Sequence, residues 1–438
     1  FSRINIIDNL LHNLESNTKK VAMINFGDFD VKFLPPQRST KIDGIRLAFH
    51  KKDLSEALDI SKKIIELGYE LYFQPMVTKN YKDVGLLSLI EDVNKLNIYS
   101  FYIVDSFGSM TLDEFQRYII LADNNLNTNI SLGYHSHNNM QLSLSNAMAF
   151  IAMQSNRQLI VDSSLMGMGR GAGNLPTEIF VNSLKRIEPQ YNLPELLEAI
   201  DNYIEPIAKK HSWGPNLAHF LSAAAGTHPN YASYLVNQKT LPVSIIQRLL
   251  NELNEIERNS YKKETIERIY LSYQEKENVD CLDTLPTAIS KPLLLAPGKS
   301  VSAQIEYIQK EICEHSYQVI AINHMPESVS CDYVFFSNQK RYNEFSHLIL
   351  DSSKLIITSN LSMLSQHKLC TRLNFRNLYE EGELCSNNAV LLLLNALKLS
   401  GNTTVAIAGL DGYQLGNEEG LIHGSSYGAL SNVEKASR

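Results

Sequence analysis

The sequence predicts an α/β protein whose first part is a parallel (β/α) barrel and whose last part is a second α/β domain. Strand-like apolar runs alternate with amphipathic helical segments, several runs end in polar residues or glycine, and the pattern starts again near residue 290. A chain of 438 residues with 44% hydrophobic content can bury two cores. The net charge of −7 argues against a nucleic-acid partner, and the longest apolar run, seven residues, argues against a membrane span.

Six strands are expected in the first part, and each is followed by a segment with helical periodicity. They cover 21–26, 44–49, 71–77, 101–105, a run that ends at the histidines described below, and 159–162. A closed barrel of this type has eight strands. We therefore expect two opening strands to be absent from this sequence, with residues 1–20 forming the helix after the second of them.

The segment 133–139, Gly-Tyr-His-Ser-His-Asn-Asn, places two histidines two residues apart at the end of an apolar run. In a strand, His135 and His137 leave the same face, so that both imidazoles can bind one metal ion. Two imidazoles leave positions for oxygen ligands, which favours a catalytic divalent ion. The alternative is a surface pair or a satisfied pair of core histidines.

The neighbouring strand ends also carry reactive or flexible residues. After the strand 159–162 comes a loop with four glycines in seven residues, in which Gly169 and Gly171 are expected to let backbone approach a substrate. The strand 101–105 ends in Asp105 and Ser106, and Thr111 is expected to cap the next helix. Three consecutive strands therefore end in residues that can bind or react.

The segments 104–110, 133–147 and 161–178 resemble the last three strand ends of the metal-dependent aldolases of the DRE-TIM metallolyase (HMGL-like) superfamily, most closely the 4-hydroxy-2-oxovalerate aldolase group. The resemblance covers roughly residues 20–185 and, more weakly, the tail to about 280. It implies that His135 and His137 bind a divalent ion (Mn, Mg, Zn or Co), with Asn174 as a further ligand. Relatives carry an Arg-Asp pair on their first strand. No such pair precedes Val21, so it either lies outside this sequence or has been lost.

The activity that the resemblance implies is that of a metal-dependent aldolase, a carbon–carbon lyase. A 4-hydroxy-2-keto acid would be made or cleaved through a pyruvate-type enolate stabilised by the ion. Ser106 is expected to hydrogen-bond the donor carboxylate, and Asp105 to orient its neighbours at the substrate. Arg170 would pair with a carboxylate or phosphate, or brace its own loop, and His50 is a candidate for proton transfer.

The three expected domains are residues 1–190 as the aldolase barrel, 191–280 as a helical region after the barrel, and 290–438 as a Rossmann-like α/β domain. In the helical region, His228 and Tyr231 are expected to form a lid, because aldolases of this group use a tyrosine near the substrate. Tyr231 is thus a catalytic candidate. The alternative is a helix cap with a packed aromatic ring.

The last domain resembles Rossmann-like bacterial glycan-related proteins. Its expected strands are 293–296, 319–323, 333–337, 355–359 and 405–409. The turn 297–300, Pro-Gly-Lys-Ser, resembles the tail of a phosphate-binding loop but lacks the upstream glycine. Its backbone amides suggest a nucleotide or sugar phosphate as partner, and the domain pairing suggests a sugar-like keto acid of a surface glycan as the product.

Two alternatives to the aldolase stay open. The first is an acyl-CoA lyase or synthase of the same superfamily, and the pair Asn138-Asn139 argues mildly against it. The second is a non-catalytic barrel whose last domain binds a nucleotide or sugar phosphate. The odd number of cysteines, five, without a secretory signal favours the cytoplasm. We expect a homo-oligomer with a small keto acid and an aldehyde as substrates.

Overall fold

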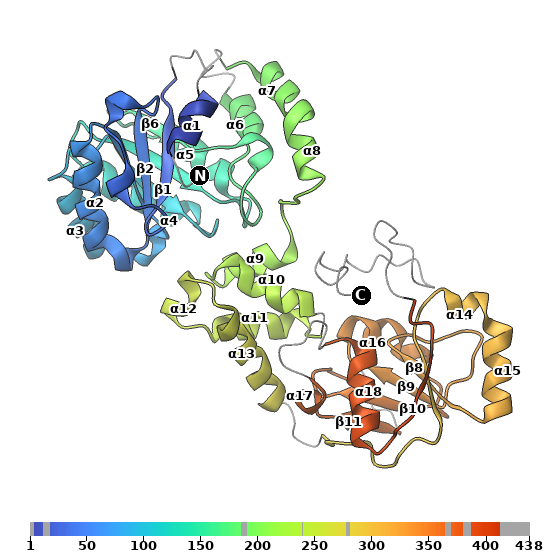
Figure 1. Ribbon diagram of the computed structural model, residues 1–438. Coiled ribbons are helices and arrows are strands. Elements are labelled where there is room, and N and C mark those ends of the chain that lie inside the picture. The colour runs from blue at the N-terminus through green and yellow to red at the C-terminus, as the bar shows by residue number, and fades with distance from the viewer. Residues whose placement is uncertain are drawn as a thin grey trace. The chain divides into compact units, whose positions relative to one another are not determined.

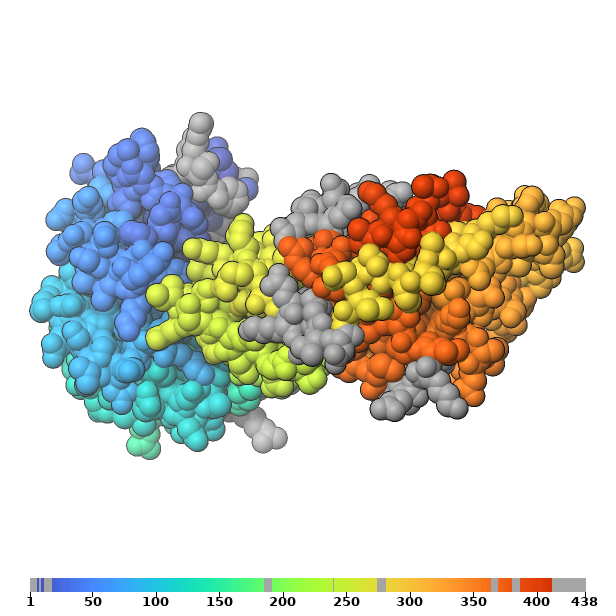
Figure 2. Space-filling model, turned by 90° about the horizontal axis from the view of Figure 1, so that it is seen from below, coloured from blue at the N-terminus to red at the C-terminus, as the bar shows by residue number. Residues whose placement is uncertain are grey.

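The computed structural model describes residues 4–11, 18–184, 191–238, 240–276, 281–363, 369–379 and 387–411. The chain divides into two compact units, residues 1–230 with 258–260, and residues 231–257 with 261–438. Each unit contains one parallel six-stranded sheet (Figure 1). The surface of the first unit is blue to green in Figure 2, and that of the second is yellow-green to red. The division falls inside the expected helical region 191–280.

The first sheet has the strand order β1-β2-β3-β4-β5-β6, and every neighbouring pair is parallel. Its strands are β1 (Val21–Asn25), β2 (Gly44–Phe49), β3 (Glu70–Pro75), β4 (Ser100–Asp105), β5 (Ser131–Ser136) and β6 (Leu159–Val161). The helices that alternate with them are α2 (Leu54–Glu66), α3 (Asp83–Val93), α4 (Leu112–Asn125), α5 (Ser143–Ala152) and α6 (Thr177–Leu184). Sequential parallel strands with helical crossovers confirm the predicted barrel-type α/β fold.

The two faces of this sheet have different surroundings. One face packs against the helices, where Phe73 and Phe101 share an apolar core with Phe115 of α4. On the other face Tyr102 lies beside Gly133 in the β4–β5 register. A Cβ atom at Gly133 would come within 2.5 Å of the Tyr102 ring, so glycine is required there to make room for it. The same face carries the polar side chains described below.

A capping motif in the sequence explains where the helix after β4 begins. Thr111 accepts a hydrogen bond from the backbone N–H of Glu114, and the Glu114 carboxylate accepts one from the N–H of Thr111. This reciprocal capping box confirms the cap expected at Thr111 and fixes the start of α4. Before β1, helix α1 (Ile4–Leu11) lies within the helix expected over residues 1–20.

The remaining helices fall into two groups. α7 (Leu193–Ala199), α8 (Glu205–Ala208) and α9 (Leu217–Ala224) belong to the first unit. α10 (Pro229–Gln238), α11 (Val243–Asn251), α12 (Glu255–Asn259) and α13 (Lys263–Lys276) lie wholly or mostly in the second. The amide of Asn360 donates to the carbonyl of Thr240 at 2.8 Å, and the rings of Tyr270 and Phe375 lie 6.2 Å apart. These contacts attach the helices to the second sheet.

The second sheet has the strand order β11-β10-β9-β8-β7-β12 and is also parallel. Its strands are β7 (Pro292–Leu295), β8 (Gln318–Ile322), β9 (Tyr333–Phe336), β10 (Lys354–Thr358), β11 (Cys370–Leu373) and β12 (Ala406–Ala408). Its helices are α14 (Ser300–Ala303), α15 (Ile305–His315), α16 (Gln339–Phe345), α17 (Phe375–Leu378) and α18 (Ala389–Leu399). The prediction of a second α/β sheet is confirmed, with β11 as a strand that we did not expect. None of the helices in the described ranges has the length and hydropathy needed to cross a bilayer.

Candidate metal centre

The two histidines lie together at the end of β5. His135 is the last but one residue of the strand, and His137 forms a backbone bridge with Asn174 of the glycine loop. The imidazole ring centroids are 5.5 Å apart and their planes are nearly perpendicular, at 87°. Two ring nitrogens that each lie ~2.1 Å from one ion place the ring centroids on the order of 5 Å apart. The spacing is therefore compatible with a shared ion.

His135 is oriented by a carboxylate that the sequence reasoning did not single out. Its Nδ1 lies 2.9 Å from Oδ2 of Asp162, directly after β6. A carboxylate only accepts, so Nδ1 is the donor, and Nε2 is the nitrogen that offers a lone pair in the tautomer able to bind an ion. Burial opposes ionisation of Asp162. The hydrogen bond with His135 and the charge of Arg46 outweigh it, so the pKa of Asp162 lies below its usual range.

Arg46 of β2 completes this polar network on the inner face of the sheet. Its Nη2 lies 2.9 Å from Oδ1 of Asp162, and the guanidinium stands 5.3 Å from the centre of the Tyr102 ring. Gln74 of β3 also donates to Asp162, at 3.4 Å. The Asp162 carboxylate thus contacts side chains from three strands, β2, β3 and β5. Through this carboxylate, Arg46 and Gln74 help to fix the position of His135.

The imidazole of His137 is held by a backbone carbonyl group, whereas that of His135 is held by a side chain. Nδ1 of His137 lies 3.2 Å from the carbonyl oxygen of Arg170, so this nitrogen donates and Nε2 again keeps its lone pair. Burial, together with the positive charges of His135 and Arg170, lowers the pKa of His137 to about 4. At neutral pH the ring is uncharged, which is the form that binds metals.

Asn174 has a side-chain oxygen that could serve as a third ligand. Its Nδ2 donates to the carbonyl of Met168 at 2.9 Å, whereas its Oδ1 is buried and has no hydrogen-bond partner among the described residues. A buried carbonyl oxygen without a partner costs about 1–3 kcal/mol unless a ligand satisfies it. Two imidazole nitrogens and this oxygen therefore fit a divalent ion. No carboxylate from the described ranges joins them to form a group of three histidine or acidic ligands.

Gly169 and Gly171 make room for side chains of the loop. A Cβ atom on Gly169 would lie 2.6 Å from Nδ2 of Asn174, and one on Gly171 would lie 2.6 Å from Oδ1 of Asn139. Asn139 in turn accepts from the N–H of Ala172 at 2.7 Å and donates to the carbonyl of Phe107 at 3.0 Å. These glycines thus serve the close packing that holds Asn174 in place.

Asp105 and Ser106 have different surroundings at the end of β4. Asp105 is 3% exposed, and its two oxygens accept from the N–H groups of Ser109 and Met110, at 3.0 and 2.9 Å. Burial raises the pKa of Asp105 against these hydrogen bonds. Both oxygens are used in shaping the loop. The hydroxyl of Ser106 accepts from the N–H of Val77 at 2.8 Å, and its own proton can still be donated to a substrate.

His228 lies close enough to Arg170 and to His50 for their charges to interact. Burial, and then the positive charges of Arg170 and His50, lower the pKa of His228 to about 4. Burial also lowers the pKa of His50, against the charge of Asp53. Both imidazoles are therefore neutral at pH 7 and can accept a proton. Arg170 is exposed, and it has no ion pair with any carboxylate of the described residues.

The low pKa of His228 predicts a pH-dependent stability. Unfolded histidine binds a proton near pH 6.5, whereas folded His228 stays neutral down to about pH 4. The unfolded state then binds more protons in this window, so the free energy of unfolding falls as the pH is lowered from 6.5 to 4. We expect a loss of about 1–2 kcal/mol by pH 5, measured by urea titration at pH 7 and pH 5. His228→Asn should reduce the loss, and an unchanged profile in this variant would contradict the assignment.

Tyr231 does not have the surroundings expected of a catalytic tyrosine. Its side chain is fully buried in the second unit, and its hydroxyl donates to the carbonyl of Glu257 at 3.0 Å and accepts from the N–H of Lys262 at 3.2 Å. This supports the alternative of a packed aromatic ring, and Tyr231 is not part of the site that we propose.

Replacement of Tyr231 by phenylalanine tests this interpretation. The variant is expected to lose about 1 kcal/mol of unfolding free energy, because two backbone groups lose a partner, and to keep the kcat of the unaltered protein. Urea titration and steady-state kinetics measure the two quantities. A large loss of kcat without a loss of stability would restore Tyr231 as a catalytic residue.

Part of the chain is similar in sequence to known proteins. A family model described as HMGL-like matches residues 46–202. A 4-hydroxy-2-oxovalerate aldolase of Pseudoalteromonas translucida is 33% identical over 171 residues, which are 38% of this chain and 48% of the relative. The protein of that name from Thermomicrobium roseum is 36% identical over 108 residues, 24% of this chain and 29% of the relative.

Among solved structures, the N-terminal domain of a proposed aldolase from Bacteroides vulgatus is 26% identical and has a TM-score of 0.47, with 54% of this chain and 78% of that chain covered. The chain spans about half the length of the first curated relatives that it matches, 48%. The family match begins inside β2 and includes β3 to β6, both histidines and the glycine loop. Residues 46–202 of this chain are therefore similar to the HMGL-like family.

Proposed function

We propose that this protein is a divalent-metal-dependent aldolase, a carbon–carbon lyase that makes or cleaves a 4-hydroxy-2-keto acid. The observation that carries the proposal is the convergence of two imidazoles, each fixed through its Nδ1, and a buried amide oxygen without a partner among the described residues, at the strand ends of an HMGL-like segment. The names of the curated relatives support the choice of a keto acid as substrate.

His135, His137 and Asn174 would hold the ion, which supplies a Lewis acid that draws electron density from the keto acid. The other groups act directly on the substrate. The Ser106 hydroxyl, whose oxygen accepts from the N–H of Val77, would donate its proton in a hydrogen bond to the donor carboxylate. The Arg170 guanidinium offers a planar pair of donors to a carboxylate, and a neutral His50 or His228 can take the proton of the 4-hydroxyl group.

We propose further that the aldehyde is sugar-like and that the product enters a surface glycan. The support for this part of the proposal is that the same chain joins the barrel to a second α/β unit. The proposal predicts that sugar aldehydes are better acceptors than acetaldehyde in condensation with pyruvate. Equal or better rates with acetaldehyde would remove this part and leave the aldolase itself untouched.

The aldolase is tested by metal analysis of the full chain, followed by an assay of pyruvate release from 4-hydroxy-2-oxovalerate. We expect bound divalent metal, loss of activity after chelation, and recovery on addition of Mn²⁺ or Mg²⁺. Cleavage of an acyl-CoA substrate in the same assay series tests the lyase alternative. Activity that is unaffected by chelation, or found only with acyl-CoA, would overturn the proposal.

A further inference from the structure

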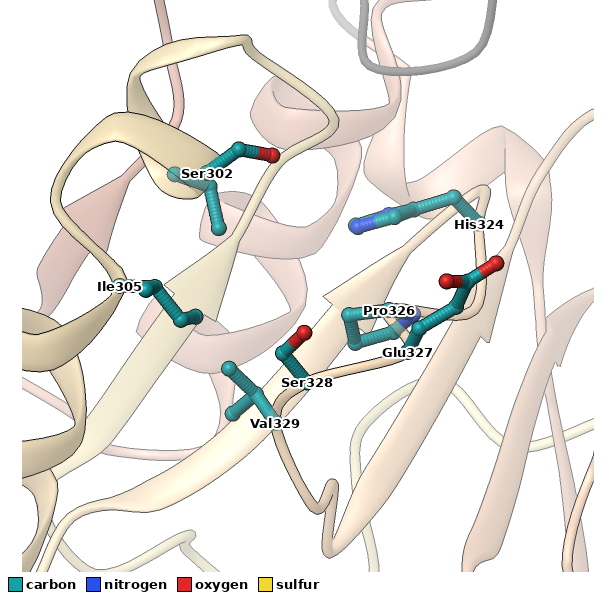
Figure 3. Close-up of a pocket in the computed structure, with 8 residues that line it drawn as sticks. Ser302, Ile305, His324, Pro326, Glu327, Ser328 and Val329 are labelled. Carbon is teal, nitrogen blue, oxygen red and sulfur yellow. The ribbon is translucent and has the colours of Figure 1, made fainter.

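The carboxyl edge of the second sheet does not offer the anion site expected at the turn 297–300. The N–H of Ser300 donates to Oδ2 of Asp411 at 2.8 Å, and the Ser300 hydroxyl bonds the other oxygen of that carboxylate. A cavity of about 300 Å³ begins one residue further on, between the α14–α15 segment and the loop after β8, and Glu327 lies in its lining (Figure 3). The described residues that line this cavity include no lysine or arginine. Acidic groups thus occupy both places, which disfavours the expected nucleotide or sugar phosphate there.

In the first unit, the glycine loop begins with a strained turn. Met166 has φ 51° and ψ 23°, in the left-handed region that side-chain-bearing residues seldom adopt. Such a conformation persists only when its surroundings hold it. The N–H of Met166 donates to Oε2 of Glu178 at 3.0 Å, and its carbonyl accepts from the indole N–H of Trp213 at 2.8 Å. Both backbone polar groups of the strained residue are therefore held by side chains.

Trp213 also lies against the second arm of the same loop. Gly173 has a φ of 90°, and a Cβ atom on it would collide with the carbonyl oxygen of Gly167 and lie 3.3 Å from Cδ1 of the indole. The two arms of the loop thus touch at Gly167 and Gly173, and the indole packs where they meet. Trp213 is half-buried and belongs to the first unit.

The turn that Trp213 holds is the turn that orients Asn174. The N–H of Asn174 donates to the carbonyl of Gly167 at 2.8 Å, and its Nδ2 donates to the carbonyl of Met168 at 2.9 Å. These two carbonyls follow Met166 directly in the sequence. A rotation of the Met166 backbone would therefore move both acceptors, and the buried Oδ1 of Asn174 would change its direction.

We propose that Trp213 is a positioning residue for the metal centre. Its indole N–H fixes the Met166 carbonyl, and the turn that follows aims Oδ1 of Asn174 at the ion. This inference rests on the proposed metal-dependent function, in which Asn174 is a ligand. Groups behind a ligand that hold its orientation strengthen metal binding, because less freedom is lost when the ion binds. Trp213 acts in this way through the loop, and not by contact with the substrate.

The test replaces Trp213 in the full chain by β-(3-benzothienyl)alanine, which keeps the shape of tryptophan and has sulfur in place of the indole N–H. The chain contains one tryptophan, so expression in a host that cannot make tryptophan changes this position alone. We expect the affinity for Mn²⁺, measured by calorimetric titration of the chelated protein, to fall ~10-fold. Amide hydrogen exchange in the glycine loop should become faster, while circular dichroism shows an unchanged fold.

Two substitutions accompany the analogue. Trp213→Phe keeps an aromatic ring against Gly173 and removes the N–H, so Mn²⁺ affinity should fall at least as far. Tyr203→Phe is the matched control, because it also removes a hydrogen-bond donor from an aromatic side chain of the segment after the barrel. Tyr203 is 70% exposed and lies between α7 and α8, so this variant should bind Mn²⁺ as the unaltered chain does.

The outcomes separate this inference from the proposed function. An unaltered chain that binds no Mn²⁺ would overturn the proposed function, and the inference with it. Tight binding by the unaltered chain and equally tight binding by the analogue would overturn the inference alone. Faster exchange in the loop without a loss of Mn²⁺ affinity would do the same, because Trp213 would then serve only the stability of the loop.

A fall in affinity that Tyr203→Phe reproduces would also overturn the inference, since the effect would not be specific to the indole N–H.

Discussion

Replacement of His135 by alanine is expected to release the divalent ion and to reduce pyruvate formation to background. The substitution removes one of two imidazoles whose Nε2 atoms are left for the ion by the hydrogen bonds at Nδ1. In metalloproteins, loss of a residue that only hydrogen-bonds a metal ligand already weakens metal binding about 10–100-fold. Loss of a ligand itself should therefore weaken it more. Calorimetric titration of the chelated protein with Mn²⁺ measures the affinity directly.

His211→Ala is the matched control for this experiment. His211 is exposed and follows α8, and no described hydrogen bond connects it to the histidine pair. The control should bind Mn²⁺ as the unaltered chain does. Metal binding and activity that survive in His135→Ala would leave the aldolase proposal without its main support. The alternative of two satisfied core histidines would then be preferred.

The second large effect is expected from Asp162→Asn. An asparagine can present an amide N–H to Nδ1 of His135, which would favour the tautomer with the proton on Nε2, the atom needed for the ion. It also removes the carboxylate that pairs with the partly buried Arg46. We expect Mn²⁺ affinity to fall about 10–100-fold and the unfolding free energy to fall by about 1–3 kcal/mol.

Arg46→Gln separates these two effects. It removes the Arg46–Asp162 ion pair but leaves the hydrogen bond between His135 and Asp162 in place. Stability should fall in both variants, whereas Mn²⁺ affinity should fall much further in Asp162→Asn. Equal Mn²⁺ affinities in the two variants would show that Asp162 acts only through the stability of the sheet.

Most strands could be predicted because their cause is local. Apolar runs bounded by turn residues located all six strands of the first sheet and five of the second. The strand β11 was missed because its sequence, Cys-Thr-Arg-Leu, has two polar residues in the middle, so it lacks the apolar run that marks the others.

The polar network around the site could not be predicted in the same way. Arg46 and Asp162 are 116 residues apart, and their contact depends on how far neighbouring strands are shifted along one another. A signal was present, since both residues place a charge on or directly after a strand that is otherwise apolar. The partners of Tyr231 were equally hidden, because they are backbone groups of a separate helix and loop.

The carboxylate of Asp162 couples metal binding to the assembly of the first sheet. It ties His135 of β5 to Arg46 of β2, so the proposed metal ligand is in place only when these distant strands are assembled. Any ion that prefers the assembled form raises the melting temperature in proportion to the logarithm of its concentration. Heating curves recorded across a series of metals would therefore rank their affinities without any substrate.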